Sequence, residues 1–308
     1  MTGVAGFVAP RHLQAIRETG NDLVAACDPF DCVGVLDRYF IGAKFFKEFE
    51  RFDRHLEKLR RRQMGIDYLS ICSPNFLHDA HIRLALRLHA DAICEKPLVL
   101  SPWNLDALQE LELESGRQIS TILQLRLHPA IQALKEGAAG ATARSQVDLS
   151  YITTRGPWYF VSWKGNEAQS GGLVTNIGIH FFDMLMWIYG AVRGSKVFLY
   201  ENNRAAGLLE LEHADVRWYL SLDPLDLPPE AVAANQTTYR SVTVGGEELE
   251  FSAGFGDLHT RAYAKILDGE GYGIEDARPS IEAVHAIRHA PVVSPGADEA
   301  HPLLSRSR

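Results

Sequence analysis

The sequence predicts an α/β protein with two domains, an N-terminal doubly wound parallel sheet and a C-terminal α+β domain with an open, mainly antiparallel sheet. The chain has 308 residues, which is enough for two separate cores. Short apolar segments alternate with helical segments as far as residue 125, a pattern typical of parallel sheets covered by helices. From residue 126 onwards, half-polar strands follow one another directly. We therefore expect domains at residues 1–125 and 126–308.

The chain opens with a glycine-containing turn, a helical segment and a strand that ends in an acid. Residues 3–9 read GVAGFVA, residues 10–19 are amphipathic, and the apolar residues 23–27 are followed directly by Asp28. Glycines let a backbone approach a pyrophosphate, a helix start offers N–H groups, and an acid about 20 residues further on accepts hydrogen bonds from a ribose. This order predicts a Rossmann domain that binds a dinucleotide through Gly6, Phe7, Val8 and Asp28. Because the Asp28 carboxylate would repel a 2′-phosphate, we expect NAD rather than NADP.

The turn departs from the usual fingerprint in two ways. Ala5 and Ala9 replace two of its glycines. Only Met1 and Thr2 precede Gly3, so the first strand of a Rossmann sheet is almost missing from the sequence. Because a central parallel strand is hard to dispense with, we expect that the start was assigned several residues late; a truncated chain is the alternative.

The alternation of strands and helices continues to residue 125. We expect strands at residues 45–46, 68–72, 91–94 and 119–125, and helices at residues 52–62, 78–88 and 101–115. The helix at 101–115 has a serine cap, a proline in its first turn and a closing glycine, Gly116. These segments complete the pattern of a doubly wound sheet.

The segment ICEKPL at residues 93–98 joins a buried strand to a charged pair. Glu95 and Lys96 follow apolar residues that suit a strand buried on both faces of a parallel sheet. Open α/β sheets place their ligands at the carboxyl ends of such strands, so Lys96 would present an amine at the lip of a cleft. Pro97 fixes the backbone beyond the pair and is a candidate for a cis peptide bond. The alternative is a surface ion pair at a strand end.

The second domain is predicted from strands in which polar and apolar residues alternate. We expect such strands at residues 145–154, 196–200, 207–211, 216–222 and 241–251. Consecutive strands of this kind favour a half-exposed, largely antiparallel sheet. Before the second of them, Arg155, Tyr159, Trp163 and Lys164 bring rings and cations to a non-periodic segment. That composition suits a polar, anionic or sugar-like ligand, and a packed loop is the alternative.

A glycine turn at residues 171–172 leads into an apolar helical segment that carries three polar residues. Asn176, His180 and Asp183 follow one another at spacings i, i+4 and i+7, so we expect them on one helix face. Gly178 between them would permit a close approach. A single histidine in such a helix is usually structural, but one flanked by Asn and Asp is a candidate general base.

Composition and missing motifs argue against several other classes of protein. Hydrophobic residues make up 46% and charged residues 23%, as in soluble globular enzymes, and the net charge of −8 argues against a nucleic-acid partner. We find neither an apolar run of about 18 residues nor a secretory signal, so we expect no membrane association and a cytoplasmic location. No zinc-spaced cluster, HExxH, GxSxG or Walker A sequence occurs, so no metal site is predicted. The cysteines lack CxxC spacing and are interpreted as reduced packing residues: Cys27, Cys32, Cys72 and Cys94.

Together these motifs resemble those of the glucose–fructose oxidoreductase, inositol dehydrogenase and MocA (Gfo/Idh/MocA) family. The resemblance covers nearly the whole chain: the glycine turn, SPN at 73–75 with His78, EKP at 95–97, WK at 163–164 and the segment 172–183. Longer strings resemble more specifically the UDP-N-acetylglucosaminuronate 3-dehydrogenases of WlbA/WbpB type from bacterial O-antigen synthesis. These strings are APRH at 9–12, RFDRHL at 51–56, QLRLHP at 124–129, SWKG at 162–165 and DLHT at 257–260.

The resemblance implies an NAD-dependent enzyme that oxidises the C3 hydroxyl of a UDP-N-acetylhexosaminuronate. It implies a Rossmann domain followed by an α+β domain whose open sheet often forms dimers or tetramers, so we expect a homodimer or homotetramer. Lys96 and His180 would be the catalytic residues at the reacting hydroxyl. The resemblance also places the following residues at the cofactor: Ser73, Asn75, His78, Glu95, Lys96, Trp163 and Lys164.

The substrate contacts and the proton acceptor are less fully specified. Arg155, Tyr159 and Ser170 are substrate candidates from their position, together with Asn176 and His180. Asn176 stands where much of the family has Asp, which leaves the choice of base open. A lysine with a lowered pKa or a neutral histidine can accept the hydroxyl proton. Two other functions stay open: a sugar or polyol dehydrogenase of the same family, or a non-catalytic NAD-binding regulator.

Overall fold

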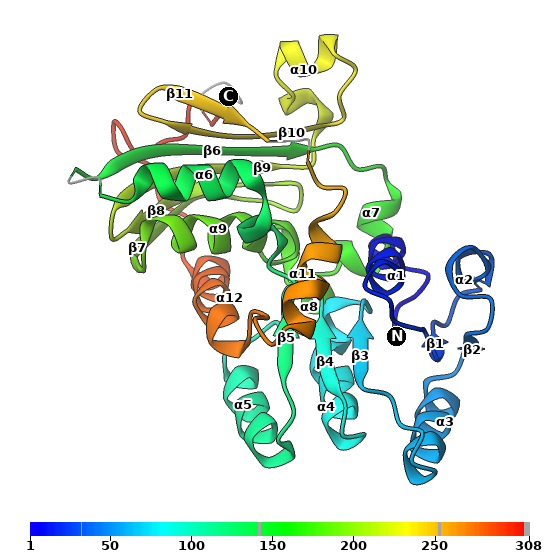
Figure 1. The fold of residues 1–308 in the computed structure, drawn as a ribbon. Helices are drawn as coiled ribbons and strands as arrows, with labels where there is room; N and C mark the ends of the chain where they lie inside the picture. Colours follow the sequence, from blue (N-terminus) through cyan, green and yellow to red (C-terminus); the bar gives the residue numbers. More distant parts are fainter. Residues whose placement is uncertain (32, 141–142, 252–253, 305–308) are drawn as a thin grey trace. The chain divides into compact units, whose positions relative to one another are not determined.

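The computed structural model describes residues 1–31, 33–140, 143–251 and 254–304 (Figure 1). Cys32, one of the four cysteines, lies outside these residues. The chain forms two compact units: the first contains Met1–Gln124 and Gly256–Arg278, and the second contains Leu125–Phe255 and the chain from Pro279. Residues 256–278 therefore pack with the first unit, although the sequence predicted them to be part of the second domain.

The first unit contains parallel strands, as the sequence predicted. β1 (Ala25–Cys27) pairs with β2 (Lys44–Phe46), and β3 (Tyr68–Ile71), β4 (Asp91–Cys94) and β5 (Ile119–Thr121) pair in that order. Thr2 forms parallel bridges with Cys27 and with Ile71. The first residues of the chain thus join the two groups of strands.

Helices accompany these strands along the chain: α1 (Ala9–Glu18), α2 (Val33–Tyr39), α3 (Phe49–Arg61), α4 (His78–Arg87) and α5 (Trp103–Ser115). A further helix, α11 (Leu258–Leu267), comes from the later segment and packs against α1. The apolar faces of α1, α3, α4 and α5 are buried, for example at Leu13, Phe52, Ile82 and Leu105. This arrangement confirms the predicted Rossmann-type organisation of the first unit.

The second unit is built on a six-stranded sheet with the order β11-β10-β6-β9-β8-β7. Its strands are β6 (Ser145–Thr153), β7 (Val192–Tyr200), β8 (Arg204–Leu211), β9 (Ala214–Ser221), β10 (Thr238–Val244) and β11 (Glu247–Glu250). β6 and β9 are parallel, whereas the other neighbours are antiparallel. The prediction of an open, mainly antiparallel sheet is confirmed.

Helices α6 (Pro129–Ala138) and α9 (Ile179–Tyr189) lie along one face of this sheet (Figure 1). Phe182 of α9 packs edge-on against Trp218 of β9, with ring centres 5.3 Å apart. The ring centres of Phe181 and Tyr151 of β6 are 4.7 Å apart. Trp218 and Phe182 are fully buried. Aromatic packing therefore fixes α9, the helix behind the predicted catalytic histidine, on the sheet.

The second unit also contains short helices and one helix that both units share. The short helices are α7 (Trp158–Val161), α8 (Glu167–Ser170) and α10 (Pro229–Ala233). In α12 (Ile274–His289), the residues up to Arg278 belong to the first unit and the residues from Pro279 onwards belong to the second. The patterns in the sequence did not predict α11 or α12.

The segment Glu167–Tyr189 is long and apolar enough to cross a membrane by length and composition alone. The sequence predicted no apolar run of this length. Its apolar window is 72% buried, which is the behaviour of a core helix in a folded domain.

Candidate active site

The glycine turn brings the start of α1 close to the end of β3. Gly3 has a φ of 74°, and a Cβ atom there would lie 2.3 Å from the carbonyl oxygen of Cys72, so glycine is required. A Cβ atom on Gly6 would lie 3.0 Å from the Gly3 oxygen. Helix α1 starts after Val8 without a side-chain cap, and the Phe7 side chain is exposed. An uncapped helix start behind a tight turn suits a phosphate group.

Asp28 directly follows β1 and is buried. Its Oδ2 accepts a hydrogen bond from the Ala5 N–H at 2.9 Å, and its Oδ1 accepts one from the Phe30 N–H at 3.0 Å. Each carboxylate oxygen has a second lone pair, so the fixed carboxylate can also accept a ribose hydroxyl. The turn, the helix start and Asp28 therefore fit an adenine dinucleotide.

Histidines hold the loop that follows β3. His78 is fully buried, with Nδ1 2.7 Å from the Pro97 oxygen and Nε2 2.9 Å from the Ser73 oxygen. The Ser73 hydroxyl lies 2.8 Å from Nδ1 of His81. Asn75, two residues after Ser73, is also buried. His78 thus connects the loops behind β3 and β4. The predicted contacts of Ser73, Asn75 and His78 with the cofactor stay predictions.

Glu95 is a buried carboxylate at the end of β4. Its Oε1 lies 2.8 Å from Nε2 of His12 and 3.1 Å from Nε2 of His259, and its Oε2 accepts the Lys96 backbone N–H at 3.3 Å. Burial raises the pKa of Glu95, but the hydrogen bonds and the electrostatic attraction of His12 and His259 together outweigh burial and hold the pKa well below its usual range. Glu95 is therefore an ionised, buried group and not part of a surface ion pair.

Lys96 and His180, the two predicted catalytic residues, are both half-buried. The Lys96–Pro97 peptide bond is cis, as expected for Pro97. Lys96 belongs to the first unit and His180 to the second. Their convergence on one hydroxyl stays a proposal.

Trp163 and Lys164 form a short 3₁₀ turn, Trp163–Gly165, in the second unit. The Lys164 Nζ lies 4.5 Å from the centre of the Trp163 ring and 5.7 Å from that of the Trp158 ring. Burial lowers the pKa of Lys164, and the positive charge of Arg155 lowers it further. A cation held between aromatic rings and near a second cation suits an anionic group.

Tyr159 and Asn176 are hydrogen-bonded to each other in the same unit. The Asn176 side-chain amide donates to the Tyr159 hydroxyl at 3.0 Å, and both residues are buried. Burial raises the pKa of Tyr159. This contact joins α7 to the start of the segment that carries His180.

Ser170 closes the turn that precedes this segment. It is fully buried, its hydroxyl donates to the Asn166 oxygen at 2.9 Å, and it accepts the Gly172 N–H at 3.0 Å. These bonds give Ser170 a role in shaping the turn. Its predicted contact with substrate stays a prediction.

Asn176, His180 and Asp183 lie on a helix that starts with a π turn. Val174–Gly178 has π geometry, and α9 follows from Ile179. A π turn contains more residues than an α turn, so the α-helical spacing predicted across this segment does not hold at its start. Asp183 accepts two hydrogen bonds from the Arg126 guanidinium, at 2.7 and 3.0 Å. Asp183 therefore belongs to a buried ion pair, whereas Asn176 contacts Tyr159.

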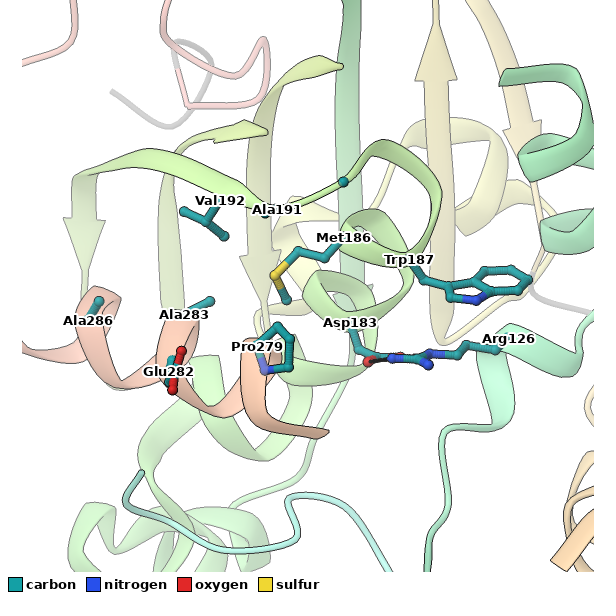
Figure 2. A pocket seen from close by; sticks show the side chains of 11 residues that line it. Arg126, Asp183, Met186, Trp187, Ala191, Val192, Pro279, Glu282, Ala283 and Ala286 are labelled. Carbon is teal, nitrogen blue, oxygen red and sulfur yellow. Dashed lines mark hydrogen bonds and ion pairs between the residues drawn. The ribbon is translucent and has the colours of Figure 1, made fainter. Parts of the chain in front are cut away.

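The Arg126–Asp183 pair also lines a pocket of about 570 Å³ in the second unit. Figure 2 shows Met186 and Trp187 of α9 on one side and Pro279 and Ala283 of α12 on another. Of the three polar residues predicted on this helix face, Asp183 lines the pocket, whereas Asn176 and His180 do not.

Four buried residues that contact the predicted site residues or one another were not among the predicted site residues: His12, His81, His259 and Tyr263. His12 and His259 are 83 and 164 positions away from Glu95 along the chain. Helical periodicity shows that such residues are buried but not which residues they meet. The available signals were the strings APRH at 9–12 and DLHT at 257–260, which contain His12 and His259 but do not show that both contact Glu95.

Comparison with known proteins identifies the family. Residues 1–122 match the Gfo/Idh/MocA description "Oxidoreductase family, NAD-binding Rossmann fold", and residues 131–227 match "Oxidoreductase family, C-terminal alpha/beta domain". The chain belongs to the Gfo/Idh/MocA oxidoreductase family. The resemblance inferred from the motifs is confirmed.

Within the Gfo/Idh/MocA family, the chain is similar to the WlbA (WbpB) dehydrogenase from Thermus thermophilus. The two are 50% identical with a TM-score of 0.95, over 98% of this chain and 97% of that one. That enzyme has been solved with NAD and α-ketoglutarate and with NAD and UDP-GlcNAcA.

Curated relatives in the family are more distant. The oxidoreductase YteT of Bacillus subtilis is 27% identical over 61% of this chain, and D-glucoside 3-dehydrogenase of Escherichia coli is 28% identical over 40% of it. The chain spans 45% and 36% of the length of these two proteins. It therefore covers less than half of each.

Proposed function

We propose that this chain is an NAD-dependent dehydrogenase that oxidises the C3 hydroxyl of UDP-GlcNAcA, in O-antigen sugar synthesis in the cytoplasm and as a homo-oligomer. The observation that carries the proposal is the 50% identity, over 98% of the chain, to a dehydrogenase solved with NAD and UDP-GlcNAcA. The choice of C3 is supported by the motif resemblance and by the relative named D-glucoside 3-dehydrogenase.

Residues of the first unit fit the cofactor. The uncapped start of α1 and the turn at Gly6, Phe7 and Val8 would receive the pyrophosphate, and Asp28 the adenosine ribose. Bound NAD supplies the acceptor for the hydride that leaves the sugar carbon. The loops behind β3 and β4, tied together by His78, would lie on the nicotinamide side.

Lys96 and His180 would manage the hydroxyl proton. In the neutral form, the Lys96 amine accepts this proton as the hydride leaves, and the resulting ammonium stabilises negative charge on the oxygen. His180 would orient the hydroxyl or share the proton. Asn176 replaces a carboxylate and donates to Tyr159, so it does not compete for the proton.

Residues of the second unit would recognise the acidic sugar nucleotide. Arg155 and Lys164 are cations that can bind the uronate carboxylate or the diphosphate by charge-assisted hydrogen bonds. Burial and the Arg155 charge both lower the pKa of Lys164, as expected for a site that binds an anion. Tyr159, Ser170 and Asn176 would supply further polar contacts. A neutral sugar or polyol would not require this pair of cations.

The test is the rate of NAD reduction with a panel of UDP-GlcNAcA, UDP-GlcNAc, UDP-glucuronate and the free sugars. We expect the highest kcat/KM for UDP-GlcNAcA, with NADP a poor substitute for NAD. A higher value for a free sugar or polyol would favour another dehydrogenase of the family. Binding of NAD without turnover of any sugar would favour a regulator.

A second arm of the experiment adds α-ketoglutarate, the molecule bound with NAD in the Thermus relative. If the chain reoxidises its cofactor in place, hydride from NADH and a proton reduce the keto group to a hydroxyl. The expected result is multiple turnovers at substoichiometric NAD, with one 2-hydroxyglutarate formed for each sugar oxidised. If turnover instead required exchange of NADH for free NAD, cofactor recycling by α-ketoglutarate would be excluded, and the proposed sugar oxidation would be unaffected.

A further inference from the structure

The carboxylate that precedes Lys96 is enclosed by two helices that are far apart in sequence. His12 lies on α1, whereas His259 and Tyr263 lie on α11, and all three are buried. Nε2 of both histidines lies within hydrogen-bond distance of the same Glu95 oxygen, at 2.8 and 3.1 Å. The His12 and His259 rings also pack edge-to-face, 4.9 Å apart. These groups all belong to the first unit.

The hydrogen bonds of this cluster run in one direction. Glu95 is ionised and only accepts, so each histidine donates from Nε2. His12 then accepts at Nδ1 from the Tyr263 hydroxyl, 2.8 Å away, and Tyr263 accepts from the Ser70 hydroxyl at 2.7 Å. Burial lowers the pKa of His12 in spite of the neighbouring Glu95, which agrees with a neutral ring. Glu95 is therefore the ionised group that His12 contacts.

The negative charge lies directly before the predicted catalytic lysine. The Glu95 Oε2 accepts the Lys96 backbone N–H at 3.3 Å, so the carboxylate also contacts the turn that presents the lysine. The other titratable groups that face Glu95 are His78 of α4, Cys72 behind β3, Cys94 of β4 and Tyr263. The only described donors on the Glu95 carboxylate from other elements are His12 and His259.

We propose that His12 and His259 are positioning residues that hold Glu95 as a buried carboxylate and thereby fix the position and charge state of Lys96. The proposal rests on the proposed catalytic role of Lys96. A buried carboxylate that loses its donors takes up a proton or turns away. Either change would weaken the contact with the Lys96 backbone N–H and remove the negative charge one residue before the lysine.

A divalent metal ion is the competing occupant of this cluster, because two imidazoles and a carboxylate are also a metal-ligand set. The observed geometry favours hydrogen bonds. The nitrogen–oxygen separations of 2.8 and 3.1 Å are those of direct hydrogen bonds, and the His12 ring has a partner on each nitrogen. Elemental analysis of the purified protein decides this point.

The experiment compares His259→Leu, which removes a donor to Glu95, with His259→Gln, whose amide can replace it. His213→Leu is the matched control, because it makes the same substitution at an exposed histidine outside the cluster. We expect His259→Leu to lower kcat about 100-fold with little change in KM, because a small displacement of a reacting group has effects of this size. His259→Gln should recover most of kcat, and His213→Leu should keep the wild-type kcat and its pH profile.

Lys96 itself is followed by NMR after reductive methylation with ¹³C-formaldehyde, its signal assigned from its loss in Lys96→Met. In His259→Leu the Lys96 amine should titrate at lower pH, because Glu95 becomes protonated and no longer stabilises the ammonium. Glu95→Gln should shift the Lys96 titration in the same direction, and this variant replaces His259→Leu in the test if His259→Leu does not fold. Unchanged titration in both variants, or a stoichiometric metal ion, would overturn the proposal.

The Lys96 titration distinguishes failure of the positioning role of His12 and His259 from failure of the proposed dehydrogenase function. If no sugar nucleotide is oxidised but the Lys96 titration shifts as expected, the function fails and the positioning role stands. If UDP-GlcNAcA is oxidised and the titration and kcat of His259→Leu match those of the wild type, the function stands and the positioning role fails.

Discussion

At the scale of single residues, the polar groups of the first unit are largely engaged with one another. His78 connects two loops through backbone oxygens, Ser73 contacts His81, and Glu95 is held by His12 and His259. Lys96 follows directly and is only half-buried. Among these residues it is the one best able to meet a substrate.

Substitution of Lys96 tests its catalytic role. Lys96→Met keeps the length of the side chain but removes the amine, so kcat should fall by about 10²- to 10⁴-fold because proton transfer is lost. The affinity for NAD, measured by quenching of tryptophan fluorescence, should change little. The matched control is Lys58→Met, an exposed lysine on α3 that should retain wild-type kcat. Near-normal turnover of Lys96→Met would refute the assignment.

Substitution of Asp28 tests cofactor choice. Asp28→Asn removes the negative charge but keeps an oxygen that can accept the Ala5 or the Phe30 N–H. We expect kcat/KM for NAD to fall and that for NADP to rise, because the 2′-phosphate is no longer repelled. Asp31→Asn, an exposed acid nearby, should leave the ratio unchanged. An unaltered NAD/NADP ratio in Asp28→Asn would show that another group excludes the 2′-phosphate.

The sequence predicted the positions of residues that depend on local order. Glu95 and Lys96 follow β4, Asp28 follows β1 and the bond before Pro97 is cis, and each feature could be predicted from a few consecutive residues. His259 and Tyr263 could not be assigned in this way, since their partners lie in segments more than 100 positions away. Buried polar contacts between distant segments depend on tertiary packing, which periodicity does not report.

At the scale of elements, the π turn before α9 is the clearest departure from expectation. The sequence predicted one continuous helix there, with Gly178 permitting a close approach. The neighbours of Gly178 are Leu220 of β9 and Phe182 of α9: a Cβ atom on this glycine would lie 2.8 and 2.9 Å from their side chains. The helix start is therefore pressed against the sheet, an arrangement that the pattern of apolar residues alone does not specify.

Gly178→Ala should destabilise the protein. The added methyl group meets packed side chains on the sheet side, and overpacking of this kind costs about 1–3 kcal/mol. The control is Gly137→Ala in α6, where a Cβ atom meets nothing within 4 Å. That substitution should be neutral or stabilise by up to about 1 kcal/mol, because alanine is the better helix former. Urea unfolding measures both, and equal stability of the two variants would contradict the packing argument.

At the scale of the whole molecule, each unit contains a buried histidine whose pKa is low. Burial lowers the pKa of His81 in the first unit and of His301 in the second to about 4. In the unfolded chain such groups titrate near pH 6.5, so between about pH 6.5 and 4 the unfolded state binds more protons. The stability that these residues contribute is therefore complete above about pH 6.5 and is lost as the pH falls towards 4.

Removal of one of these histidines should weaken the acid sensitivity. His301 stacks on Tyr219, and its Nδ1 accepts the Leu303 N–H at 3.1 Å, a bond that a protonated ring cannot make. We expect His301→Phe to reduce the loss of unfolding free energy between about pH 7 and about pH 4.5 by roughly 2–3 kcal/mol. His89→Phe, at an exposed position, should leave this pH dependence unchanged. Identical slopes for the wild type and His301→Phe would contradict the assignment.

The return of α11 to the first unit has a consequence for how the protein is made. Residues 1–124 emerge from the ribosome long before Gly256–Arg278 is translated. The strands of the second unit's sheet are synthesised between these two segments. Until then the nascent first unit lacks His259, and the face of α1 that α11 covers is exposed. Chaperones therefore have a defined interval in which to bind this surface, and the Glu95 cluster is completed only after most of the chain has emerged.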